Sequence, residues 1–170
     1  MNVEMITLSN GLRIITDVDR TVDTVALGVW VGSGSRNELH TLNGISHLLE
    51  HMVFKGTKKR SAYKLAEEMD DVGGHLNAYT SRDHTAFYSK VLKNDIRLAV
   101  DILSDIFLNA ELDEMEFSRE KEVVMQEIHQ SLDSPEDIVF DHLQNTAYPK
   151  QSIGFPILGT LESVKSIKVD

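Results

Sequence analysis

The stretch GISHLLEHMVFKGT, residues 44–57, combines a helical apolar pattern with side chains that can bind a metal or a proton. Its apolar residues recur with the spacing of one helix face, namely Ile45, Leu48, Leu49, Met52 and Val53. A second set has the same spacing on the opposite face, namely His47, Glu50, His51 and Phe54. Asn43 is a suitable N-cap, and Gly56 is a suitable end for the helix. Two imidazoles and a carboxylate within one turn are unusual on a solvated face, so we expect this face to hold a metal.

The pattern H-x-x-E-H gives each of these three residues a chemical role. Histidines at i and i+4 lie one turn apart and can bind one ion together, while Glu50 between them can accept a proton from metal-activated water. The alternative is a helix with hydrogen-bonded histidines and a surface glutamate. A catalytic zinc site uses three protein ligands, so the metal interpretation requires one more.

The segment FSREKEVVMQEIHQS, residues 117–131, offers two candidates for the third ligand. Glu120 and Glu127 are seven residues apart, so they share one face of a predicted helix. Either glutamate could equally be a solvated side chain on an acidic helix. Spacing alone does not choose between them.

The composition limits the classes of protein and partner. The chain has 170 residues, of which 41% are hydrophobic and 26% charged, as in a globular protein with one sizeable core. Its net charge of -10 disfavours nucleic acid and anionic membranes as partners and favours a cationic substrate. The absence of cysteine excludes disulfides, thiol catalysis and cysteine-ligated zinc. We see neither a signal peptide nor a membrane-spanning run, so we expect a cytoplasmic protein, or a protein of an organelle matrix if a presequence has been removed.

Hydrophobic periodicity predicts strands, then a helix pair, two more strands and further helices. A hairpin is expected around Asn10-Gly11, and a third strand carries Trp30, which we expect to be buried. This order favours an α+β fold, a mainly antiparallel sheet with helices packed on one face. The tail ILGTLESVKSIKVD, residues 157–170, shows no closing element. We therefore expect one domain, residues 1–170, that is incomplete at its C-terminal end.

Five segments carry a family resemblance, and they are WVGSGSRNE, GISHLLEHMVFKGT, GGHLNAYTSRDHTAFY, EKEVVMQEI and FDHLQNTAY. The chain resembles the N-terminal, metal-bearing domain of the pitrilysin (insulinase) family of zinc peptidases, above all the branch of the mitochondrial-processing-peptidase beta subunits. The resemblance implies one zinc ion with His47, His51 and Glu127 as ligands. It also implies Glu50 as the general base and Glu120 as a supporting acid that orients a ligand histidine.

The same resemblance implies a substrate site. It makes Asn77, Ala78 and Tyr79 part of an edge strand that pairs with an extended peptide, although a plain sheet strand is the simpler interpretation. It places Phe54 in a pocket for the residue after the cleaved bond, where ordinary core packing is the alternative.

The resemblance to the processing-peptidase branch also implies that Asp137 and Asp141 receive an arginine just before the cleavage point. They are four residues apart on a predicted helix, where like charges repel weakly. A solvated helix face is the alternative.

These features predict a zinc metalloendopeptidase that cleaves extended peptides, including presequence-like peptides with an arginine near the cleavage site. The alternatives are a non-catalytic scaffold subunit that binds a partner protein and a plain structural metal domain. The family resemblance also implies that the substrate is enclosed between two halves. We therefore expect a second half from an identical subunit, a different subunit or the same polypeptide, and weak or no activity from the 170 residues alone.

Overall fold

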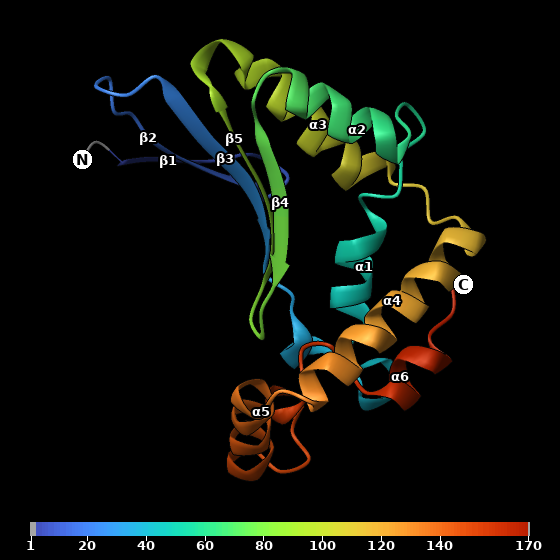
Figure 1. Cartoon of the computed structure of the whole chain (residues 1–170). Coiled ribbons are helices and arrows are strands. Elements are labelled where there is room, and N and C mark those ends of the chain that lie inside the picture. Colours follow the sequence, from blue (N-terminus) through green and yellow to red (C-terminus); the bar gives the residue numbers. More distant parts are fainter. Residues whose placement is uncertain (1–2, 170) are drawn as a thin grey trace.

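The computed structural model describes residues 3–169, which form two antiparallel sheets and six α-helices (Figure 1). The strands are β1 (Val3–Thr7), β2 (Arg13–Asp17), β3 (Thr24–Val31), β4 (His75–Thr80) and β5 (Thr85–Leu92). The α-helices are α1 (Ile45–Met52), α2 (Ala62–Asp71), α3 (Ile96–Asn109), α4 (Glu114–Leu132), α5 (Pro135–Ala147) and α6 (Leu161–Ser166). Short 3₁₀ turns are η1 (Ser35–Asn37), η2 (His40–Leu42), η3 (Lys93–Asp95) and η4 (Ser152–Gly154).

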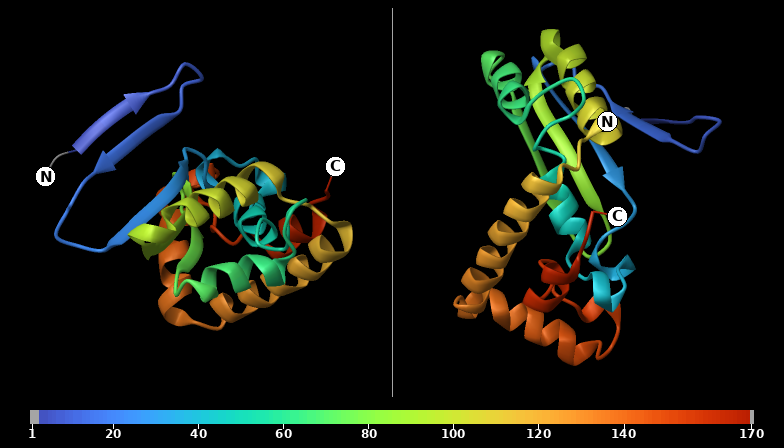
Figure 2. Two further views of the ribbon diagram at one scale, coloured as in Figure 1. Left: turned by 90° about the horizontal axis from the view of Figure 1, so that it is seen from above. Right: turned by 90° about the vertical axis from the view of Figure 1, so that its right-hand side faces the viewer.

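The predicted N-terminal hairpin is present and stands apart from the rest of the molecule (Figures 1 and 2). β1 pairs with β2 from Val3 opposite Asp17 to Thr7 opposite Arg13. The turn follows from its sequence: Asn10 Oδ1 accepts a hydrogen bond from the Leu12 N–H, and Gly11 adopts a positive φ of 88°. Every residue of both strands is exposed.

The second sheet has the order β3-β5-β4, and α2 and α3 cover one of its faces (Figure 1). This arrangement confirms the expected α+β fold with an antiparallel sheet. The expectation of a buried Trp30 is wrong, because its side chain is 61% exposed. Side chains alternate along a strand, and in β3 Leu27 and Val31 face the core beneath the helices, so Trp30 lies on the uncovered face.

Two hydrophobic clusters hold the helices in place. The first fills the space between the sheet and α2 and α3 and contains Phe87, Ile102 and Ile106. The second joins α1, α4 and α6 through Leu48, Val124 and Val164. The second cluster fixes the helix with the H-x-x-E-H pattern against the helix with the two candidate glutamates.

The structure corrects the predicted bounds of α1. The helix begins after Gly44, whose φ is 94°, and ends at Met52 rather than near Gly56. Asn43 does not cap it, because its side chain donates hydrogen bonds to Glu38 Oε2 and the Pro156 carbonyl. Leu49, predicted on the core face, is 46% exposed.

The C-terminal tail contains a helix that periodicity does not reveal. α6 is short and depends on a capping box between Thr160 and Ser163 and on the burial of Val164 and Ile167. Among the described residues, no helix has the length and apolar character needed to cross a membrane.

Candidate metal centre

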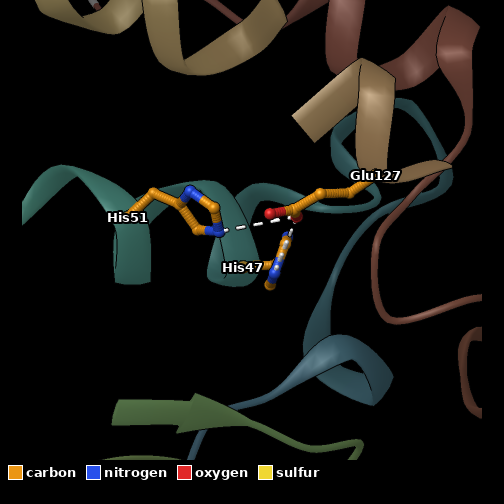
Figure 3. Close-up of side chains that lie close together, drawn as sticks. All are labelled: His47, His51 and Glu127. Carbon is orange, nitrogen blue, oxygen red and sulfur yellow. Dashed lines mark ion pairs between the residues drawn. The ribbon is translucent and has the colours of Figure 1, made fainter. Parts of the chain in front are cut away.

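Three side chains from two helices converge on one point (Figure 3). His47 and His51 project from successive turns of α1, and Glu127 reaches them from α4. Glu127 Oε2 lies 3.7 Å from His47 Nε2 and 3.6 Å from His51 Nε2. One ligand atom from each residue lies within 4.8 Å of the other two.

These distances suit one zinc ion. Atoms that each lie about 2.1 Å from one ion at tetrahedral angles are about 3.4 Å apart, so the spacing of the three donors needs little adjustment. Two imidazoles and one carboxylate are also a donor set that catalytic zinc sites use, with a fourth position left for water or substrate.

The structure separates the two glutamates that spacing could not rank. Glu120 lies behind His51, where its Oε2 accepts a hydrogen bond from Nδ1 at 3.1 Å. Its other oxygen pairs with Lys55 Nζ at 2.7 Å, and the Glu120 side chain is 8% exposed. Glu120 is thus placed to orient the His51 ring, while Glu127 faces the Nε2 atoms of both histidines.

His47 has a different environment from His51. Its Nδ1 is buried and has no hydrogen-bond partner among the described residues. Burial, together with the nearby His51 charge, lowers the pKa of His47 to about 4. The ring is therefore neutral at pH 7, the form in which imidazole binds a metal.

Glu50 lies beside the three donors and is held by a strand. Thr80 Oγ1, at the end of β4, donates a hydrogen bond of 2.6 Å to Glu50 Oε2. Burial raises the pKa of Glu50, and the Thr80 hydrogen bond opposes that rise. A carboxylate with a raised pKa next to a metal site is suited to take up and release a proton.

An open cavity of about 610 Å³ joins this centre to α5. His47, Glu50 and Glu127 line it on one side and Asp137 and Asp141 on another. The remaining lining residues are Tyr79, Thr80, Gln130, Ser131, Phe140, Ile157 and Leu158.

Asp141 already has a partner in this cavity wall. Its Oδ1 accepts a hydrogen bond of 3.1 Å from Arg82 Nη2, and Arg82 also donates from Nε to the Ile153 carbonyl. Asp137 forms no ion pair with any residue in the described part of the chain. Its carboxylate is the less neutralised of the two.

The predicted substrate strand, β4, lies at the edge of its sheet. Asn77 is exposed, Ala78 is buried, and the Ala78 N–H donates to Asn77 Oδ1 at 2.8 Å. Tyr79 lines the cavity, and its hydroxyl lies 3.0 Å from His84 Nε2. Phe54 lies beyond the end of α1 in a different cavity of about 260 Å³ between α2 and the start of β4.

Several cavity residues escaped the sequence analysis. Gln130 lies three residues after Glu127, so helical spacing could have identified it. Thr80, Ile157 and Leu158 carry no local signal, since only the folding of β4 and the tail brings them to α1.

Comparisons with known proteins point to one family. The profile of the family described as "Insulinase (Peptidase family M16)" matches residues 13–161. The chain is 46% identical over 168 residues, 99% of its length, to a Bacillus subtilis protein named uncharacterized zinc protease YmxG. It is 44% identical over 161 residues, 95% of its length, to a protein of Arabidopsis thaliana named probable mitochondrial-processing peptidase subunit beta.

A solved structure has the same fold. The crystal structure of a protease from Helicobacter pylori matches 99% of this chain with a TM-score of 0.94 and 28% sequence identity. The match covers 41% of that protein, and the two curated relatives are covered over 41% and 30% of their lengths. The chain thus spans less than half of the proteins it resembles.

Proposed function

We propose that this chain, which belongs to the insulinase family of peptidases (family M16), forms the zinc-binding part of a metalloendopeptidase. The observation that carries the proposal is the convergence of His47, His51 and Glu127 beside Glu50. The names of the relatives, a zinc protease and processing peptidases, support the same reaction class.

His47 and His51 would hold one zinc ion through Nε2, and Glu127 through a carboxylate oxygen. Zinc in such a site supplies a Lewis acid that polarises the scissile carbonyl and acidifies water. Glu50 accepts the proton of the attacking water on its carboxylate and delivers it to the departing amine nitrogen. Thr80 keeps the Glu50 carboxylate turned toward the cavity, and Glu120 holds the His51 ring through Nδ1.

The substrate in this proposal is an extended peptide that adds a strand to β4. An edge strand offers backbone groups that bind a peptide regardless of its side chains. Asn77, Ala78 and Tyr79 would form this pairing, with the Ala78 N–H released from Asn77 Oδ1 to the peptide. Phe54, in the cavity beside the start of β4, would contact the side chain after the cleaved bond.

An arginine before the cleavage point would bind at α5. Asp137 and Asp141 share the cavity of Glu50, which supports this role. The Arg82 contact alters the expected mechanism, because the repulsion between the two aspartates is already partly relieved within the chain. We therefore assign the larger part of arginine recognition to Asp137.

A second half would complete the substrate chamber. The cavity is open, and the chain spans 30–41% of the two curated relatives. An identical subunit, a different subunit or a longer form of the same polypeptide could supply the opposite wall. We propose no nucleic-acid or membrane partner, since the net charge of -10 opposes binding to anionic surfaces.

Zinc content and peptide cleavage together test the proposal. After dialysis we expect about one zinc per chain by elemental analysis, as a single three-ligand site predicts, and clear loss of zinc in Glu127→Ala. Glu50→Gln should retain zinc and lose cleavage of an extended fluorogenic peptide, measured with the chain alone and with a longer form of the protein.

The outcomes separate the competing functions. Absence of zinc even after its addition would reject the metal centre. Zinc binding without cleavage in either form would favour a scaffold subunit that binds a partner protein.

A further inference from the structure

Glu38 is a buried carboxylate at the start of the metal-binding helix, outside the set of proposed zinc ligands. Its Oε2 accepts hydrogen bonds from the Gly44 N–H at 2.8 Å and from Asn43 Nδ2 at 2.9 Å. Its Oε1 accepts one from the Ser46 N–H at 2.8 Å. Glu38 is 8% exposed, and no ion pair joins it to another residue within 3–169. Its charge is therefore stabilised by N–H groups at the positive end of α1.

The local backbone explains why this carboxylate comes from outside the helix. Gly44 occupies the N-cap position, where a serine or aspartate would normally accept a hydrogen bond from the first turn. A Cβ atom at Gly44 would lie 2.6 Å from the Leu158 carbonyl oxygen, so a side chain cannot be accommodated there. Glu38 supplies the missing acceptor from six residues earlier in the chain.

The two histidines differ in how they are held. His51 has its own polar partner, Glu120. The Nδ1 atom of His47 has no such partner among the described residues, and His47 lies in the first turn of α1, immediately after Ser46. The direction of the His47 ring therefore depends on where that first turn begins.

We propose that Glu38 is the positioning residue for His47. Its carboxylate fixes the position of the first turn of α1, and this position keeps His47 Nε2 close to His51 Nε2 and to the Glu127 carboxylate. This inference rests on the zinc site of the proposed function. One of its two tests uses metal-free protein and does not require that zinc binds.

The principal variant is Glu38→Gln, and Asp113→Asn is its matched control. A glutamine amide keeps one acceptor oxygen but presents an NH₂ group to the remaining donors, so at least one N–H of the first turn loses its partner. Asp113 caps α4 in the same way, through the Met115 and Glu116 N–H groups. Asparagine at position 113 keeps this acceptor oxygen and removes only the charge. Glu127 lies about 21 Å along α4 from that cap, so the ligand should stay in place.

Zinc affinity is the first measurement, made by competition with a chromophoric chelator. We expect Glu38→Gln to weaken zinc binding about tenfold or more, the range found for residues that orient ligands. Asp113→Asn should change affinity less than twofold although it removes a carboxylate charge from the N-terminus of α4. An affinity of Glu38→Gln within twofold of the parent, or an equal loss in both variants, would overturn the proposal.

The second measurement uses metal-free protein and NMR. We expect Glu38→Gln to speed amide exchange at Gly44 and Ser46 and to shift the His47 imidazole resonances, with no such change in Asp113→Asn. Unchanged His47 resonances would overturn the proposal. If the parent binds no zinc, the proposed function fails while this measurement still decides the role of Glu38.

Glu38→Asp covers the case in which the glutamine variant does not fold. It retains the charge but is one methylene too short to reach both backbone N–H groups. Its zinc affinity should lie below that of the parent, and parent-like affinity in the folded variant would contradict the inference.

Discussion

The α1–α4 pair and helix α5 line one cavity, yet they are built differently. In α1 and α4, Leu48, Met52, Val124 and Ile128 are buried. In α5 no residue is buried, and Phe140 is 66% exposed. The groups proposed to react therefore stand on helices with buried apolar residues, whereas the groups proposed to bind arginine stand on a helix that has none.

Polar side chains show the same contrast. Glu50 and His51 each have a hydrogen-bond partner from another element, Thr80 and Glu120 respectively. On α5 only Asp141 has an ion-pair partner among the described residues, and Asp137 remains available. Catalysis requires reacting groups to be held accurately, while an aspartate that binds a flexible arginine can tolerate movement.

The largest expected effect separates a reactive carboxylate from a nearby acidic side chain. Glu50→Gln should lower kcat/KM for a peptide by about 10²- to 10⁴-fold, because it removes the proton acceptor while zinc stays bound. Glu136→Gln makes the same substitution at an exposed position of α5 and should change kcat/KM less than twofold. A similar loss in both variants, measured at equal zinc content, would show that negative charge in this region matters rather than Glu50 itself.

The free energy of unfolding should also distinguish the α1–α4 pair from α5. Leu48→Ala should lower the free energy of unfolding by about 2–5 kcal/mol, because it leaves a cavity between α1 and α4. Leu143→Ala, whose side chain on α5 is 60% exposed, should change it by less than about 0.5 kcal/mol. Urea unfolding of metal-free protein measures both, and equal losses would contradict the assignment of the core.

The pH dependence of stability should depend on His47 and not on the exposed His142 of α5. The pKa of His47 is about 4 in the folded protein, below its ordinary value of 6.5. Between these values the unfolded chain binds a proton that the folded protein does not, so stability falls as pH decreases from 6.5 toward 4. The loss reaches about 3 kcal/mol at most.

Urea unfolding in the presence of a chelator at pH 7 and pH 4.5 tests this expectation. His47→Gln should lose less stability on acidification than the parent does. His142→Gln should behave like the parent. If both variants follow the parent, the neutral state of His47 makes no contribution to the acid response.

The smallest expected effect concerns arginine selectivity. Asp137→Asn should reduce the preference for an arginine peptide over a matched norleucine peptide by about 1 kcal/mol, five- to tenfold, because a partly exposed charge pair is lost. Asp141→Asn should have a smaller effect, since Arg82 already neutralises part of its charge. The ratio of the kcat/KM values for the two peptides measures this selectivity. An unchanged ratio in the variant that combines Asp137→Asn and Asp141→Asn would show that α5 does not bind the arginine.

The sequence predicted the elements well where the signal was local. The Asn10-Gly11 hairpin and the two strands predicted after the helix pair, β4 and β5, are all present. Periodicity failed at Trp30 and Leu49, which are apolar but exposed, because a pattern identifies a face and not what covers it. It also missed α6, whose six residues are too few for a periodic signal.

By itself the sequence determined which chemistry is available: two histidines and a glutamate in one helical pattern, two further glutamates seven residues apart, and no cysteine. Only the tertiary structure decided which glutamate faces the histidines, because that depends on the packing of Val124 and Ile128 against Leu48. It likewise decided that Thr80 holds Glu50, that Arg82 reaches Asp141 and that Glu38 caps α1. Helical spacing acts over one or two turns, whereas contacts between distant segments arise only when their apolar faces are buried together.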